Sequence, residues 1–199
     1  SLALTGVGVC MPIIMIVSAF AALVSSGGAP RASIYMGKQD NQSAEKILGS
    51  CFFLQIIVSF ILTAVLLFWG KDILLAFGAS ENTISYASNY MRIYAFGTLF
   101  VQLTLGMNAF ITAQGFTTIS MISVLIGAIC NIVLDPVFIF AFHMGVKGAA
   151  LATVISQAIS TLWIVLFLCG KKTQLHLRKK YMRLTPKVII PCVALGLAR

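Results

Sequence analysis

Few side chains in this sequence could do chemistry, and the clearest candidates lie in the apolar stretch Ile119–Phe142. That stretch is long enough to cross a bilayer, since a membrane-spanning helix needs about 20 apolar residues. It nevertheless contains Asn131 and Asp135, which are four residues apart and therefore share one helical face. A carboxylate deep in a membrane helix costs roughly 3 kcal/mol, so it usually faces the protein interior and serves a function there. Pro136 removes a backbone donor and predicts a loosened helix beside the acid.

Thr153 lies in the next apolar stretch, Ala149–Cys169, where hydroxyl side chains recur. With the oxygens of Asn131 and Thr153 nearby, Asp135 could hold a sodium ion, a hard cation that prefers oxygen ligands. A carboxyl group kept away from water could instead bind and release a proton. Both chemistries suit ion-coupled transport, and the sequence leaves the choice open. A competing interpretation places Asp135 near a helix end, reaching for the lipid headgroups, although six apolar residues still follow Pro136.

No enzyme motif accompanies these residues. The sequence has no HExxH, GxSxG or P-loop pattern, and its two histidines, His143 and His176, lie in connections without partner ligands. Asp135 is the only acid or base within the apolar stretches, so neither catalysis nor a cofactor is expected. Five cysteines occur singly and show no disulfide or metal-ligand spacing. They are Cys10, Cys51, Cys130, Cys169 and Cys192.

The composition is that of a membrane protein. Hydrophobic residues make up 59% of the 199 residues and charged residues only 10%, with a mean hydropathy of +0.99. A soluble domain would carry about 25% charged residues. The net charge of +9 would suggest nucleic acid as a partner for a soluble domain. Most basic residues lie in connections between apolar stretches, however, so the positive-inside rule explains them and no nucleic-acid partner is expected.

The apolar stretches predict an all-α, polytopic bundle with about five complete membrane spans and the start of a sixth. The predicted helices are Leu2–Ser25, Ile47–Trp69, Thr83–Ala113, Ile119–Phe142, Ala149–Cys169 and a last one from Val188. Gly27–Pro30 is expected to close the first span and Gly70–Asp72 the second, leaving Ile73–Phe77 as a short interfacial piece. Residues 1–170 then form one bundle, 171–187 a basic linker, and 188–199 the start of a second unit.

Ten of the 14 Lys and Arg residues lie in two connections, which predicts the orientation of the chain. Three of them (Arg31, Lys38 and Lys46) follow the first span, and seven lie within 171–187. Four predicted crossings separate the two connections, so both lie on one side, which the positive-inside rule makes cytoplasmic. Short loops and the lack of a targeting sequence indicate the cytoplasmic membrane of a bacterium or archaeon. Both ends run into or out of apolar stretches, which suggests an internal piece of a longer protein.

Several motifs, in order, resemble the multidrug and toxic compound extrusion (MATE) family of efflux transporters. The resemblance runs from Gly27 to Lys172 and rests on GGAP, SIYMG, AEKILG, FGASENTISYASNYMRIYAFG, NAFITAQG and NIVLDPVFIFAFHMGVKGAALATVISQ. It implies twelve helices in two six-helix lobes around a cavity with alternating access. This chain would supply helices two to six and the start of helix seven. Its partners would be the bilayer, small-molecule drugs, and the first helix and second lobe of the same protein.

The resemblance also implies roles for individual residues. In the prokaryotic branch, the coupling site of the N-terminal lobe uses an Asn and an Asp on helix five and a Thr on helix six. Asn131, Asp135 and Thr153 match these positions in type and spacing. Another coupling acid lies on helix one, outside this chain. The substrate-cavity candidates are Asn108, which matches a helix-four position, and, more weakly, Gln157 and Gln102, for which interhelical hydrogen bonding is the alternative.

Three functions are considered at this stage. The resemblance favours a secondary active antiporter that exports amphipathic, often cationic drugs in exchange for protons or sodium ions. A lipid or lipid-linked oligosaccharide flippase of the same wider superfamily would carry cationic residues in its cavity, and no Arg or Lys lies in the middle of a span. A non-transporting receptor or assembly subunit would use the polar residues for helix packing only, with Asp135 paired structurally.

Overall fold

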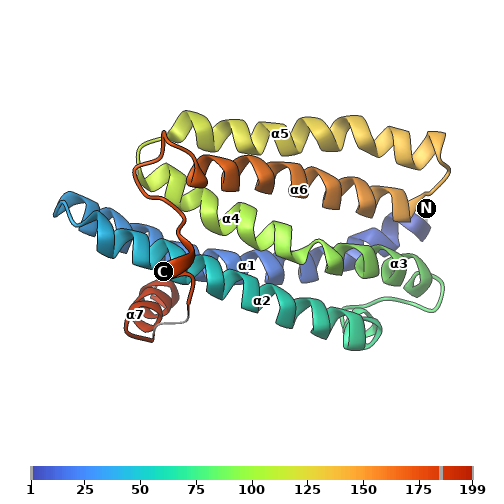
Figure 1. Ribbon diagram of the computed structural model, residues 1–199. Coiled ribbons are helices and arrows are strands. Elements are labelled where there is room, and N and C mark those ends of the chain that lie inside the picture. The colour runs from blue at the N-terminus through green and yellow to red at the C-terminus, as the bar shows by residue number, and fades with distance from the viewer. Residues whose placement is uncertain (1, 184–185, 199) are drawn as a thin grey trace.

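The computed structural model describes residues 2–183 and 186–198, and every regular element in these ranges is a helix (Figure 1). The elements are α1 (Leu2–Gly37), α2 (Asn41–Ala76), α3 (Ile84–Phe96), α4 (Thr98–Ala113), α5 (Thr117–Pro136), the π-helix η1 (Val137–Ala141), α6 (Val146–Cys169), the 3₁₀-helix η2 (Lys179–Tyr181) and α7 (Pro186–Leu197). Four spans are long and apolar enough to cross a membrane, and the bent pair α3–α4 makes a fifth. The predicted all-α multispan fold is confirmed. Residues 184–185 of the predicted linker and Arg199 lie outside the described residues.

Helix α1 is the centre of the bundle and packs against α2, α3, α4 and α7. Helix α6 packs against α3, α4 and α5, and Figure 1 shows α5 and α6 side by side at one edge. Ser120 and Ser123 are the buried residues of α5, and its large apolar side chains are mostly exposed. Helix α5 is therefore the outermost span, with one polar face turned toward α4 and α6.

Helix α1 is longer than the sequence predicted. It does not close at Gly27–Pro30 but continues to Gly37. The two glycines serve close packing instead of a turn, because a Cβ on Gly27 would overlap the Cys192 carbonyl oxygen of α7. A Cβ on Gly28 would lie 2.7 Å from the Cys51 sulfur of α2. Small residues of this kind let membrane helices approach closely.

Helix α2 also differs from the prediction, since it passes through Gly70 and ends at Ala76. Its last turns are held by Leu74, which is fully buried in a cluster with Ala87 and Met91 of α3. This packing outweighs the cost of about 1 kcal/mol that a glycine imposes inside a helix. Ile73–Phe77 is thus mostly the end of α2, and no separate interfacial piece forms.

The predicted helix Thr83–Ala113 is divided into α3 and α4, which meet at Gly97 with a bend of 56°. The bend lies where Gly97 touches α6, because a Cβ on Gly97 would come within 2.5 Å of the Val154 Cγ2 atom. The Gly97 amide still donates to the Tyr94 carbonyl at 2.9 Å. A contact distant in sequence therefore lies at the break, and the uniformly apolar pattern gave no sign of it.

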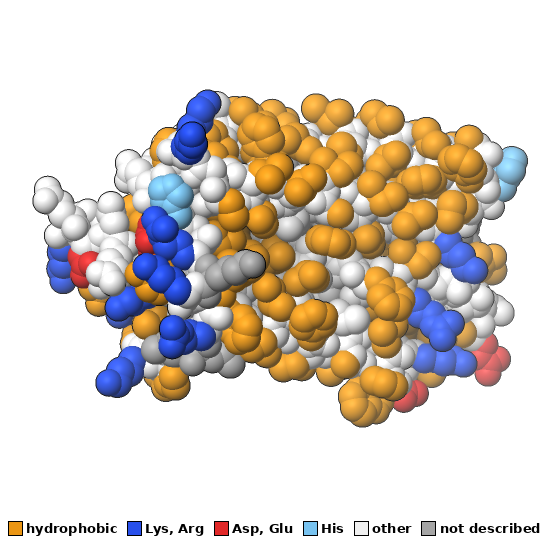
Figure 2. All heavy atoms as spheres, viewed as in Figure 1, with side chains coloured by type: hydrophobic (Ala, Val, Ile, Leu, Met, Phe, Trp, Pro, Cys, Tyr) orange, Lys and Arg blue, Asp and Glu red, His pale blue; other side chains and the backbone are white. Residues whose placement is uncertain are grey.

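Charge is separated along the bundle as a membrane protein requires. Figure 2 shows a wide band of hydrophobic side chains with Lys and Arg gathered at its two ends. Arg31, Lys46 and Lys187 line one hollow, so the two basic connections lie at the same end of the bundle. Lys71 lies 25 residues further along α2 than Lys46, which corresponds to about 38 Å. The apolar part of α2 between these two lysines covers the thickness of a bilayer.

Candidate functional site

Asp135 lies where the regular α-helix of α5 ends. Pro136 follows it, and the next five residues, Val137–Ala141, form the π-helix η1. Proline lacks the backbone donor that an α-helical turn requires, which accounts for the change at this point. Gly148 of α6 packs directly on this segment, since a Cβ there would lie 2.9 Å from the Phe138 carbonyl oxygen. The loosened helix beside the acid, predicted from the sequence, is confirmed.

Asn131 and Asp135 form a hydrogen-bonded pair. With the amide nitrogen of Asn131 facing the carboxylate, it donates to Oδ1 of Asp135 at 3.1 Å and to Oδ2 at 2.6 Å. Both side chains are partly buried. A neutral amide donor stabilises the carboxylate by a hydrogen bond. Because it adds no positive charge, it does not repel a cation that binds to the carboxylate.

Thr153 approaches the same region from α6, through a tyrosine of α3. Its hydroxyl donates to the Ala149 carbonyl at 3.0 Å, and the phenol of Tyr90 lies near it. The phenol of Tyr90 also lies within electrostatic reach of Asp135. Among the described residues, no hydrogen bond joins Thr153 to Asp135. The candidate residues therefore lie on α5 and α6, with Tyr90 of α3 nearby.

Tyr90 is a site residue that reasoning from the sequence missed. It is buried and stacks on Tyr94, with ring centroids 6.2 Å apart and an interplanar angle of 13°. In the sequence these two residues look like an aromatic pair one helical turn apart. The sequence does show a phenol hydroxyl, and a buried hydroxyl needs a hydrogen-bond partner. The sequence does not show which residue that partner is.

Asn108 lies in a different part of the molecule. Its side-chain oxygen accepts a hydrogen bond from Ser123 at 3.0 Å, and Thr112 donates to Ser120 at 2.8 Å one turn further on. Ser123 precedes Asp135 by 12 residues, or about 18 Å along α5. The structure therefore places Asn108 in a polar row between α4 and α5, apart from the Asn131–Asp135 pair.

Gln102 and Gln157 are also separate from that pair. Gln102 is fully buried, and its amide donates to the Val17 carbonyl at 2.6 Å, which links α4 to α1. Gln157 is partly buried on α6, and its backbone carbonyl accepts from the Thr104 hydroxyl at 3.5 Å. Thr104 in turn pairs with Thr161 at 2.7 Å. Both glutamines thus lie along the packing of α4 against its neighbours.

The family of this chain follows from comparison with known proteins. The MatE family model matches residues 1–137. The chain belongs to this family. The motifs noted in the sequence therefore reflect relationship and not composition alone.

Relatives of this MatE chain are described as transporters. The multidrug export protein MepA of Staphylococcus haemolyticus is 29% identical over 194 residues, which cover 98% of this chain. The chain spans 43% of the length of that relative. An enzyme was not expected from the sequence, and the relative's description agrees with that.

Solved MatE structures match the arrangement of the helices. A multidrug resistance MATE family transporter of the MOP superfamily in an inward-facing conformation aligns with a TM-score of 0.92 at 25% identity, over 98% of this chain and 45% of the other. An outward-facing structure with the same description aligns with a TM-score of 0.90 at 25% identity, over 98% and 43%. The same helix packing therefore fits the matched part of both conformations.

Proposed function

We propose that this chain forms the N-terminal lobe of a secondary active multidrug transporter that exports amphipathic, cationic drugs in exchange for protons or sodium ions. The chain spans less than half of its relatives, so the activity is that of the complete transporter. The relatives are a multidrug export protein and multidrug resistance transporters, which supports this substrate class. By the family resemblance, a further coupling acid lies on a helix outside this chain.

The observation that carries the proposal is the proximity of Asn131 to Asp135 within a membrane span, with Thr153 on the adjacent helix α6. The Asp135 carboxylate offers oxygen ligands to a cation, and the Asn131 amide can add its oxygen when it turns over. Such a set suits a sodium ion or a proton and has no fixed positive charge to compete with either.

The mechanism follows from where the acid is placed. Asp135 lies at the junction of α5 and η1, and η1 packs against Gly148 at the start of α6. When a cation neutralises the carboxylate, the donors of Asn131 and the hydroxyls nearby must rearrange. We infer that this rearrangement shifts α5 relative to α6 and α3, and so changes the drug affinity of the lobe.

In the proposed orientation, the end of the bundle that carries ten of the Lys and Arg residues lies in the cytoplasm of a prokaryotic cell, according to the positive-inside rule. Helix α5 then carries Asp135 about 27 Å from that end, since 18 residues separate it from Thr117. The coupling site would thus open toward the outer side of the membrane, from which protons or sodium ions enter.

The test is reconstitution of the complete transporter in lipid vesicles with a fluorescent cationic drug inside. Export is measured with a pH gradient alone, with a sodium gradient alone, and with neither. Acceleration by one gradient supports antiport and identifies the ion. Equal rates in all three conditions would refute ion coupling.

A further inference from the structure

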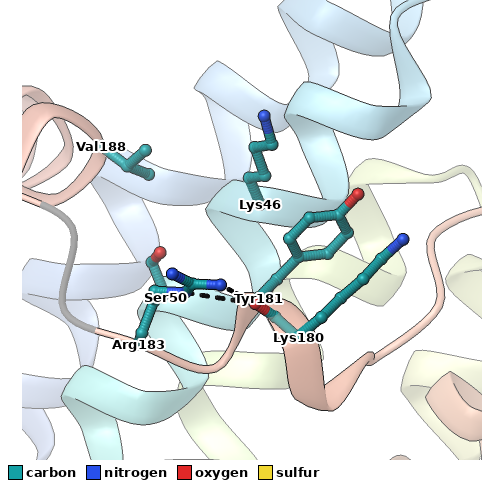
Figure 3. A pocket seen from close by; sticks show the side chains of 6 residues that line it. All are labelled: Lys46, Ser50, Lys180, Tyr181, Arg183 and Val188. Carbon is teal, nitrogen blue, oxygen red and sulfur yellow. Dashed lines mark hydrogen bonds between the residues drawn. The ribbon is translucent and has the colours of Figure 1, made fainter.

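A basic hollow of about 290 Å³ lies at the end of the bundle opposite Asp135 (Figure 3). It is lined by Lys46 and Ser50 of α2, Lys180, Tyr181 and Arg183 of the segment after α6, and Val188 of α7. A second hollow of about 100 Å³ shares Lys46 and Val188 and adds Arg31 and Lys187. We call the two hollows together the basic groove. It lies between α2 and the start of α7 and contains none of the proposed coupling residues.

The basic groove holds five cationic side chains and no carboxylate in its lining. Among the described residues, Glu45 pairs with Arg178, and none of the groove cations forms an ion pair with a carboxylate. The Nε atom of Arg31 is buried without a hydrogen-bond partner in the described structure. Like charges gathered in this way repel one another, so an anion in the groove would be stabilised.

Backbone packing, and not only flexible lysines, builds the groove. A Cβ on Gly49 would lie 2.7 Å from the Tyr181 carbonyl oxygen, so only a glycine lets this backbone rest on α2. Arg183 is oriented by its Nε and Nη2 atoms, which donate to the Lys180 carbonyl at 3.3 and 3.1 Å. Figure 3 shows Tyr181 between Lys46 and Lys180, and the Lys180 ammonium lies 4.9 Å from the ring centroid.

The depth of the groove indicates which anion fits it. Lys46 immediately precedes the apolar part of α2, and Lys187 immediately precedes that of α7. The groove therefore lies at the boundary between water and hydrocarbon, where phospholipid phosphates reside. Its apolar side is Val188, and the neighbouring Ile190 of α7 is 65% exposed, which offers a surface to an acyl chain.

We propose that the basic groove binds the phosphate of an anionic phospholipid, with Lys46, Lys180 and Arg183 around its oxygens. The bound phosphate would join α2 to the segment before α7 and hold α7 against the bundle. A soluble phosphate has the same oxygen chemistry, and the depth of the groove favours the lipid. This site does not depend on the proposed transport function, because lipid binding is measured without a drug or an ion gradient.

The test measures binding of a fluorescent short-chain phosphatidylglycerol to the complete transporter in detergent, by fluorescence anisotropy. The groove variant is Lys46→Gln/Lys180→Gln/Arg183→Gln. Its matched control, Lys71→Gln/Arg92→Gln/Lys147→Gln, removes the same charge at the opposite end of the bundle. We expect roughly 100-fold weaker binding by the groove variant and no change in the control, because each basic residue near an anionic lipid contributes about a factor of five.

Further arms separate the remaining explanations. The charge-preserving variant Lys46→Arg/Lys180→Arg/Arg183→Lys should bind within about threefold of the parent, which excludes misfolding as the cause of a loss. Phosphatidylcholine of the same chain length should compete poorly. Equal losses in the groove variant and the control, or equal competition by phosphatidylcholine, would overturn the proposal. Displacement by millimolar inorganic phosphate would overturn the lipid as the ligand.

Discussion

With its amide oriented to donate, Asn131 places its side-chain nitrogen 3.1 and 2.6 Å from the two carboxylate oxygens of Asp135, one turn further along α5. This contact orients the carboxylate along its own helix, so the acid does not depend on a distant partner to hold its position. It also places both groups directly before Pro136, where the α-helix ends. A change in the charge of Asp135 therefore acts where the α-helix gives way to the π-helix η1, beside a proline that lacks a backbone donor.

The first prediction concerns the acid itself. Asp135→Asn in the complete transporter should abolish ion-driven drug export, because the amide cannot exchange a proton or bind sodium as a carboxylate does. Membrane insertion should be unchanged, since the side chain keeps its shape and becomes less costly in the bilayer. The measurement is export of a fluorescent drug from vesicles, normalised to the inserted protein. Asp72→Asn, which changes an exposed acid at the end of α2, serves as the control. Unchanged export by Asp135→Asn would contradict the coupling role.

The second prediction concerns Tyr90. Tyr90→Phe removes the hydroxyl that lies near Thr153 and Asp135 and keeps the stacked ring, so the lobe should fold normally. If this hydroxyl stabilises the ion-bound site by about 1 kcal/mol, as a typical hydrogen bond does, half-maximal export should need roughly a fivefold higher concentration of coupling ion. Tyr94→Phe is the matched control, because Tyr94 lies one turn along the same buried face. Equal effects of the two variants would show that the Tyr90 hydroxyl has no special part in coupling.

The sequence predicted those features that depend on residues close together in the chain. The continuous apolar stretches gave α5 and α6, and the four-residue spacing gave the Asn131–Asp135 pair. Tyr90 and the bend at Gly97 escaped because each depends on a contact with α6, more than 50 residues away. The glycines Gly27 and Gly28 were interpreted as a turn, although they serve close packing within a longer helix. Glycine permits both, and only the neighbouring helices decide between them.

The third prediction tests the contact that accompanies the bend between α3 and α4. Gly97→Ala should destabilise the protein by about 1–3 kcal/mol, because the new methyl group would meet Val154 at 2.5 Å. Val154→Ala should restore much of this loss when the two changes are combined, since it removes the opposing methyl groups. Thermal unfolding of the complete transporter in detergent gives the comparison. Strictly additive losses in the double variant would mean that the Gly97–Val154 contact does not set the cost.

The fourth prediction concerns Glu45, which anchors the basic segment after α6 to α2. Its Oε1 atom accepts from the His176 amide at 3.1 Å, and its Oε2 atom accepts from the Arg178 Nε at 3.0 Å. Glu45→Gln keeps the shape and the acceptor for His176 but loses the ion pair with Arg178, whose side chain is 48% exposed. That exposure limits the loss to about 1 kcal/mol, so trypsin should cleave the segment roughly fivefold faster.

Two further variants test whether Glu45 holds the segment through its hydrogen bonds or through net charge. Glu45→Ala removes the acceptor for the His176 amide as well, so cleavage should be faster than in Glu45→Gln. Glu81→Gln removes an equal charge from an exposed acid at the opposite end of the bundle and should leave the rate unchanged. If Glu81→Gln accelerated cleavage as much as Glu45→Gln, net charge would account for the effect. In that case the segment would be held by its further contacts to the bundle, among them the hydrogen bond from Thr173 to the Gln114 side chain at 2.9 Å.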